Sequence, residues 1–186
     1  MLKPEMTKSE IERDLQGKGN FVQIDHLNRF LKDHPLSMDT KKFIFLKLAS
    51  LYESSKLFGE TAKAYDNAAS ISLTFAEKIK HYTKAAESYA RLGAFDRIDE
   101  AMRKAMSEAN SREREDIQAT IKMMYKTQAT QLESEMKRSH AVKFYEKLLD
   151  MRLSDQERRD IREKLSDLYV KLGKLNEYQA LKRSLS

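Results

Sequence analysis

Apolar residues recur along the chain at the spacing of an α-helix. Phe45, Leu48, Ala49 and Tyr52 stand at positions i, i+3, i+4 and i+7, which places them in one stripe on a helical surface. No segment shows the alternation of apolar and polar residues that indicates a β-strand. The pattern therefore predicts an all-α protein. The expected helices span residues 7–17, 22–33, 40–55, 58–72, 75–92, 95–109, 112–135, 138–151, 155–172 and 175–184.

The same apolar stripe repeats at a nearly constant interval. The positions Phe45, Leu48, Ala49, Tyr52, Phe58, Tyr65 and Ala68 recur 37 residues later as Tyr82, Ala85, Ala86, Tyr89, Phe95, Met102 and Ala105. A step of 43 residues leads to the next copy, and a further step of 37 leads to the last. Such periods are typical of solenoids, because a single helix pair cannot bury its apolar face alone.

The repeat predicts one domain over residues 1–186, folded as an α-α superhelix (solenoid) of about five antiparallel helix pairs. The expected units span residues 7–35, 40–72, 75–110, 112–151 and 155–186. The helix that opens near Arg112 should be the longest, since it absorbs the extra residues of the irregular step. Three Ser/Thr-x-x-Glu sequences predict capping boxes at helix starts. They are Thr7 with Glu10, Thr74 with Glu77, and Ser154 with Glu157.

The best copy of the repeat resembles the tetratricopeptide repeat, which orders large, small and aromatic residues in this way over two helices. Its signature positions are Tyr82, Ala85, Ala86, Tyr89, Gly93, Phe95, Ile98, Met102 and Ala105. The chain lacks the Trp and the terminal Pro of that pattern, never places Gly before the signature Tyr, and exceeds the usual period of about 34 residues. The long period is similar to that of an α-SNAP-like variant of the repeat, which has longer helices.

In a stack of helix pairs, the first helix of each pair lines the concave side of the stack. On each of these helices, the row of residues next to the buried row faces the concave groove. The candidate groove residues are Phe43, Leu46, Ser50, Lys80, Thr83, Glu87, Met123, Lys126 and Thr130, followed in the last unit by Asp160, Glu163, Asp167 and Val170. This mixture of apolar and charged side chains suits an extended peptide or an amphipathic helix. For Phe43 and Leu46 the alternative is that they pack on the preceding helix pair.

These features predict a non-catalytic adaptor or scaffold that binds another protein along the concave groove. The net charge of +6 leaves a nucleic-acid-binding helical repeat as the alternative, although the excess of Lys and Arg is spread along the chain without a basic arm. The sequence contains no Cys, and none of its four His residues has a second His at the i+4 spacing of a zinc site. We therefore expect no metal, no cofactor and no enzymatic activity. The second alternative is an enzyme, for which the discriminating observation would be a deep pocket between helices that encloses convergent polar groups.

No stretch approaches the roughly 18 apolar residues that a membrane-spanning helix needs, and the first residues lack the apolar run of a signal peptide. We expect no membrane span and a cytoplasmic protein. The last apolar stripe, formed by Leu175, Tyr178, Leu181 and Leu185, either docks inward or meets a second copy. The expected state is a monomer or a weak homodimer.

Overall fold

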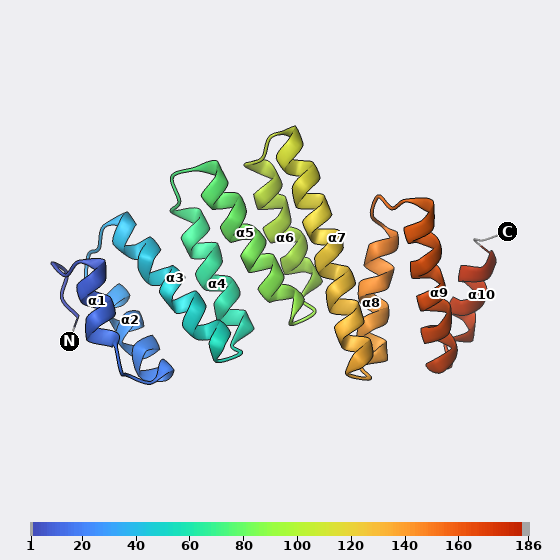
Figure 1. The fold of residues 1–186 in the computed structure, drawn as a ribbon, viewed down its shortest axis with the longest axis horizontal. Coiled ribbons are helices and arrows are strands. Elements are labelled where there is room, and N and C mark those ends of the chain that lie inside the picture. Colours follow the sequence, from blue (N-terminus) through green and yellow to red (C-terminus); the bar gives the residue numbers. More distant parts are fainter. Residues whose placement is uncertain (1, 184–186) are drawn as a thin grey trace. The chain divides into compact units, whose positions relative to one another are not determined.

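The computed structural model describes residues 2–183, and within that range it contains ten α-helices and no strand (Figure 1). The helices are α1 (Lys8–Leu15), α2 (Asn20–Asp33), α3 (Met38–Ser54), α4 (Phe58–Ser70), α5 (Phe75–Ala90), α6 (Phe95–Ser107), α7 (Ser111–Ser134), α8 (Arg138–Leu149), α9 (Asp155–Lys171) and α10 (Leu175–Arg183). The prediction of an all-α protein is confirmed. Each of the ten predicted helices is present, and α7 is the longest with 24 residues.

The chain forms two compact units, Met1–Ile117 and Gln118–Ser186, which divide within α7. The single repeat domain over residues 1–186 and the five-pair superhelix stay predictions. Leu185, the last member of the predicted C-terminal stripe, lies outside the described residues.

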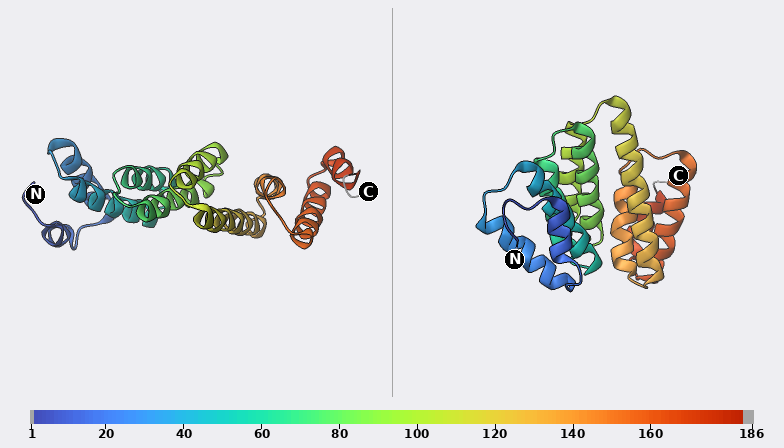
Figure 2. Two further views of the ribbon diagram at one scale, coloured as in Figure 1. Left: turned by 90° about the horizontal axis from the view of Figure 1, so that it is seen from above. Right: turned by 60° about the vertical axis from the view of Figure 1, so that its left-hand side comes forward.

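In the first unit, consecutive helices from α2 to α6 pack against one another and lie side by side in chain order (Figures 1 and 2). Its N-terminal core gathers Ile11, Leu15, Ile24, Leu27 and Leu48 from three helices. On α3 the fully buried large side chain is Ile44, whereas Phe45 and Tyr52 of the predicted stripe are only half-buried. The buried arc of α3 is broad because this helix packs on both α2 and α4.

In the second unit, α9 packs against both α8 and α10. The helices α7 and α8 meet through their aromatic side chains, since the rings of Tyr125 and Phe144 lie edge to face with centroids 5.7 Å apart. Ala129, Ala141 and Leu165 of the same unit are fully buried.

Backbone features recur 80 residues apart in the two units, which is the length of one 37-residue and one 43-residue step. Lys56 and Met136 both adopt the left-handed conformation, with φ of 58° and 61°, at the turns after α3 and α7. Gly93 and Gly173 do so at the turns after α5 and α9, with φ of 66° and 70°. Glycine adopts this conformation without the steric cost that a side chain brings.

Side-chain contacts recur at the same spacing. The hydroxyl of Tyr89 donates to Asp66 at 3.1 Å, and that of Tyr169 donates to Glu146 at 2.8 Å. The first bond joins α5 to α4, and the second joins α9 to α8. A second recurring contact joins α3 to α5 in the first unit and α7 to α9 in the second. These ion pairs are Lys42–Glu77 at 2.9 Å and Lys122–Glu157 at 2.7 Å.

Candidate binding cleft in the second unit

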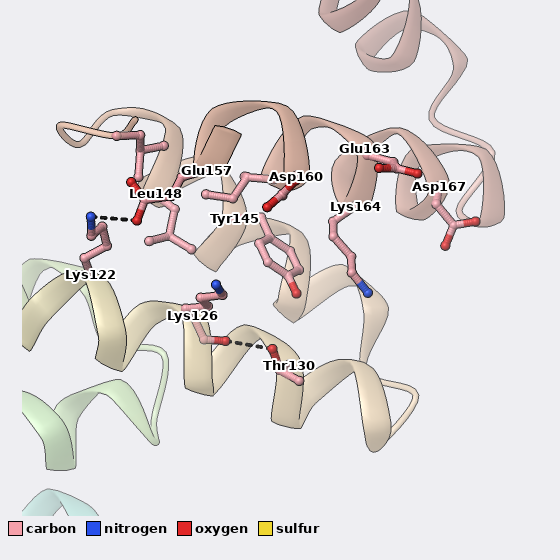
Figure 3. Close-up of a pocket in the computed structure, with 12 residues that line it drawn as sticks. Lys122, Lys126, Thr130, Tyr145, Leu148, Glu157, Asp160, Glu163, Lys164 and Asp167 are labelled. Carbon is pink, nitrogen blue, oxygen red and sulfur yellow. Dashed lines mark hydrogen bonds and ion pairs between the residues drawn. The ribbon is translucent and has the colours of Figure 1, made fainter. Parts of the chain in front are cut away.

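A cleft of about 560 Å³ opens between α7, α8 and α9 (Figure 3). It is lined by Lys122, Lys126 and Thr130 of α7, Tyr145 and Leu148 of α8, Leu153 of the following loop, and Glu157, Asp160, Ile161, Glu163, Lys164 and Asp167 of α9. The α7 residues share one side of the helix because positions four apart lie one above the other. The cleft therefore has two long helical walls, and its floor is supplied by α8 together with Ile161 of α9.

The floor is apolar and the walls are polar. Tyr145, Leu148 and Ile161 are buried, with Leu148 wholly shielded from solvent. The exposed lining residues, in contrast, belong to α7 and α9. They are Lys126, Thr130, Asp160, Glu163, Lys164 and Asp167. An apolar floor below solvated walls describes an open groove and not an enclosed cavity.

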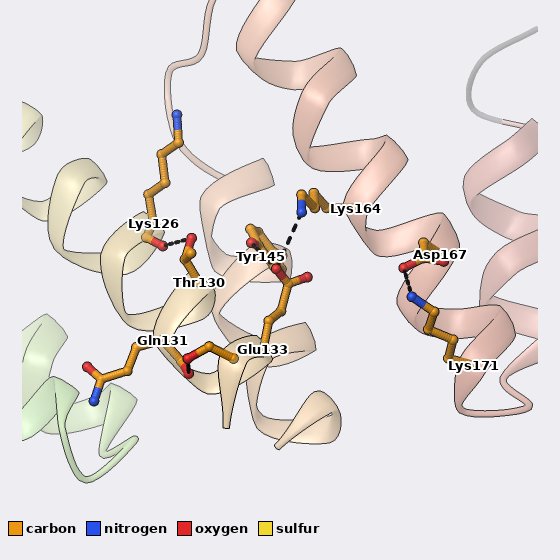
Figure 4. A network of polar contacts seen from close by, with 9 residues as sticks. Lys126, Thr130, Gln131, Glu133, Tyr145, Lys164, Asp167 and Lys171 are labelled. Carbon is orange, nitrogen blue, oxygen red and sulfur yellow. Dashed lines mark hydrogen bonds and ion pairs between the residues drawn. The ribbon is translucent and has the colours of Figure 1, made fainter. Parts of the chain in front are cut away.

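One end of the cleft holds a polar network (Figure 4). The hydroxyl of Tyr145 donates to Glu133 at 3.2 Å, and the ammonium of Lys164 lies 3.5 Å from the same carboxylate oxygen. Burial raises the pKa of Tyr145, so its phenol stays protonated and remains a donor at neutral pH. The hydroxyl of Thr130 donates to the carbonyl of Lys126 at 2.9 Å, which holds that side chain against its own helix.

At the other end, Glu157 links the start of α9 to α7. Its carboxylate pairs with Lys122 at 2.7 Å and accepts the backbone N–H of Ser154 at 2.8 Å, which completes the capping box predicted there. The Lys122 ammonium and the Ser154 N–H lower the pKa of Glu157 to about 2. Glu157 is therefore ionised at neutral pH. The predicted box at Thr7 is also complete, whereas at Thr74 the carboxylate of the partner Glu77 reaches Lys42.

Not every charge in the cleft is neutralised within the chain. Asp167 pairs with Lys171 at 2.6 Å, and Asp160 accepts a hydrogen bond from the uncharged Gln156 amide at 2.7 Å. Within residues 2–183, neither Lys126, Asp160 nor Glu163 has an ion-pair partner within 4.0 Å. One unpaired cation thus faces the cleft from α7, and two unpaired anions face it from α9.

The structure brings together part of the predicted groove in this unit. Lys126 and Thr130 line the cleft, as do Asp160, Glu163 and Asp167 from the predicted stripe of the last unit. Met123 is 67% exposed and lies outside the lining. Because successive residues are about 100° apart around an α-helix, Met123 lies a quarter turn away from Lys122. Val170 is likewise exposed and outside the lining.

Sequence reasoning missed several lining residues, among them Lys122, Tyr145, Leu148 and Lys164. Lys122 stands four positions before Lys126, so helical spacing alone could have added it to the α7 wall. Tyr145 and Leu148 match the apolar repeat, and nothing in that pattern distinguishes a core residue from a cleft floor.

The six candidates of the first unit lie on α3 and α5. Phe43 is half-buried and packs against the N-terminal core, which favours the alternative that it contacts the preceding helices. Leu46 and Thr83 are half-buried, and Ser50 and Lys80 are exposed. The Thr83 hydroxyl donates to the carbonyl of Ile79 at 2.8 Å, and Glu87 pairs with Lys84 at 2.6 Å. Their role in binding stays a prediction.

Residues 2–183 contain no group of three or more His, Asp or Glu side chains placed to hold a metal ion. Over the same range no helix has both the length and the apolar character needed to cross a bilayer. Comparison with known proteins yields no matching family model and no significant match among curated proteins. The resemblance to the tetratricopeptide repeat therefore rests on the sequence pattern.

Proposed function

We propose that this chain is a non-catalytic adaptor of the tetratricopeptide type, in which the cleft of the second unit holds a segment of a partner protein. The observation that carries the proposal is the open groove with a buried apolar floor and walls of opposite unpaired charge. The two contacts that recur 80 residues apart support the repeat architecture on which the proposal depends.

The exposure of the walls favours a peptide over a small molecule. A site for a small ligand typically buries 70–90% of the ligand surface in a concave, mostly apolar pocket. Here half of the lining residues remain exposed, so a compact ligand would keep much of its surface in water. An extended or helical segment can instead run between α7 and α9 and leave the cleft at both ends.

The floor provides the binding energy, and the walls provide register. Full burial of one Leu or Phe side chain contributes about 1.5–3 kcal/mol, and a partner side chain over Ile161 and Leu153 gains part of that, because the cleft is open and Leu148 exposes no surface. Exposed ion pairs with Lys126, Asp160 or Glu163 contribute only about 0.2–1 kcal/mol each. They therefore orient the segment more than they hold it.

The charge of the lining disfavours nucleic acid at this site. The cleft presents four carboxylates and three ammonium groups, whereas a phosphate backbone is bound by an excess of cations. A salt-dependent affinity for RNA or DNA would need another part of the surface.

A matched pair of variants tests the proposal. Peptides are selected on the full chain from a displayed library of random segments, and their affinities are then measured by fluorescence polarisation. Thr130→Phe fills the cleft from α7, whereas Thr127→Phe places the same ring on an exposed position of α7 outside the lining. We expect the selected peptides to lose at least about tenfold in affinity for the Thr130 variant alone. Equal binding to both variants would refute the cleft as the binding site.

A further inference from the structure

We infer that His81 of α5 is an acid-sensitive switch in the first unit, which takes up a proton as the solution becomes mildly acidic and thereby loosens the packing of α5 on α3 and α4. The switch is a regulatory feature of the first unit. It does not depend on the cleft of the second unit.

His81 occupies a position that is apolar in the other copies of the sequence repeat. The equivalent residues are Ile44, 37 positions earlier, Met124, 43 positions later, and Ile161, a further 37 positions on. Ile161 is 6% exposed and so is His81, while Ile44 is wholly buried. A titratable ring thus stands where packing alone calls for an aliphatic side chain. Such departures from a local pattern are typical of functional or strained positions.

The surroundings of the ring suit a neutral imidazole and not a charged one. Nδ1 of His81 is buried, and no polar group of the described residues forms a hydrogen bond with it. The ring lies nearly parallel to that of Tyr65 on α4, with centroids 6.4 Å apart and an angle of 18° between the planes. In the imidazolium both nitrogens are donors, so protonation would bury an N–H group without an acceptor.

The charged groups that act on His81 come from α3 and α5. Glu77, one turn earlier on α5, favours the imidazolium, whereas Lys80 of α5 and Lys42 of α3 oppose it. The carboxylate of Glu77 is already bound to the Lys42 ammonium at 2.9 Å. It could accept a proton from the imidazolium only by giving up part of this ion pair, which joins α3 to α5.

The helices α4 and α6 also pack against α5. The titratable group that α4 brings to His81 is the Tyr65 phenol, whose pKa is raised by burial, so that it is uncharged at neutral and acidic pH. The ammonium of Lys104 on α6 lies 5.8 Å from the ring centroid of Tyr82, the next residue of α5. Burial is therefore the main influence on His81, and together with the two ammonium groups of α3 and α5 it lowers the pKa of the imidazole.

Acid weakens the first unit because its open form accommodates the imidazolium better than its closed form does. In the unfolded chain His81 has its ordinary pKa of 6.5, and in the folded unit the pKa is lower. The stability that depends on a neutral His81 is therefore complete above pH 6.5 and is lost as the pH falls below that value. Each pH unit in this range lowers the ratio of closed to open molecules by up to about tenfold.

Hydrogen exchange of the full chain at about pH 7.5 and about pH 5.5 tests the switch. Each rate is divided by the intrinsic exchange rate at the same pH, so that the protection factors report opening alone. We expect the protection of the α4 and α5 amides to fall by at least about threefold between the two pH values, and that of the α8 and α9 amides by less than about twofold. In a nuclear magnetic resonance titration of the wild type, the ring of His81 should take up its proton below pH 6.5.

The matched variants are His81→Ile and His81→Met, which carry at this position the residues of positions 161 and 124. Both remove the titrating group and keep an apolar side chain, so their first-unit protection should change by less than about twofold. His140→Gln removes an exposed histidine of α8 and should behave as the wild type does. A fall in protection that persists in both His81 variants, a wild type without such a fall, or a His81 ring that titrates at or above pH 6.5 overturns the inference.

Discussion

The hydrogen bond from Tyr89 to Asp66 offers the sharpest test of how successive helix pairs are joined. Tyr89 is 9% exposed, and its hydroxyl donates to one oxygen of Asp66, while the other oxygen of that carboxylate is buried without a partner. Burial raises the pKa of both groups, and that of Tyr89 reaches about 12. Replacement of Tyr89 by Phe keeps the ring and removes only the donor.

The magnitude follows from what each substitution leaves behind. A hydrogen bond to a charged group contributes about 1.5–3 kcal/mol, and half-burial of Asp66 places the expected cost of Tyr89→Phe near the lower end. Tyr89→Ala also removes a large buried ring and should cost about 3–5 kcal/mol. In the background of Asp66→Asn the cost of Tyr89→Phe should fall by about 1 kcal/mol, because the charged acceptor is gone.

Urea unfolding followed by circular dichroism gives the free energies, and hydrogen exchange of the α4 and α5 amides assigns the change to the first unit. The unit-resolved measurement matters because the chain has two compact units and need not unfold in one step. Tyr89→Phe with wild-type stability, together with no coupling to Asp66→Asn, would refute the idea that this bond joins the helix pairs.

Three further predictions concern the second unit. Tyr169→Phe should destabilise the second unit by less than Tyr89→Phe destabilises the first, because the acceptor Glu146 is exposed whereas Asp66 is half-buried. A larger cost for Tyr169→Phe in urea unfolding would contradict this. The pKa of Glu157 is lowered from 4.5 to about 2, so this residue adds stability that is complete above about pH 4.5 and is lost as the pH falls toward 2. In an acid titration, the free energy of unfolding of Glu157→Gln should therefore fall less steeply over this window than that of the wild type. Equal slopes would count against the ion pair with Lys122. Leu148→Ala should lower the free energy of unfolding by about 2–5 kcal/mol, and Met123→Ala by less than about 0.5 kcal/mol, as measured by thermal unfolding. Similar losses for the two variants would show that Leu148 is not a buried residue of the cleft floor.

Much of the secondary structure could be predicted from the sequence, because helical periodicity and capping residues act locally. Ser154 and Glu157 mark the start of α9, and the structure forms the full capping box there. Which residues of α3 are buried could be predicted less well from the sequence. Phe45 and Ile44 are adjacent and both apolar, and only the positions of α2 and α4 decide that Ile44 is the fully buried one.

The cleft could be predicted only in part. Helical spacing places Lys126 and Thr130 on the side of α7 that lines the cleft, whereas Met123, predicted to lie in the same groove, is outside the lining. A repeat pattern gives the angular position of a residue on its helix. It does not say where two helices diverge enough to leave a gap above Tyr145 and Leu148. The oligomeric state and the cytoplasmic location stay predictions.

Photo-crosslinking from the α7 wall tests the central claim most directly. The reactive residue p-benzoylphenylalanine is placed at Lys126, where it replaces an already long and exposed side chain of the cleft lining, or at Thr127 of the full chain, and each protein is irradiated with a peptide selected on the wild type. The account predicts a covalent adduct from position 126 and none above background from position 127. Equal adducts from the two positions, or none from position 126, would contradict the claim that the second-unit cleft receives a partner segment.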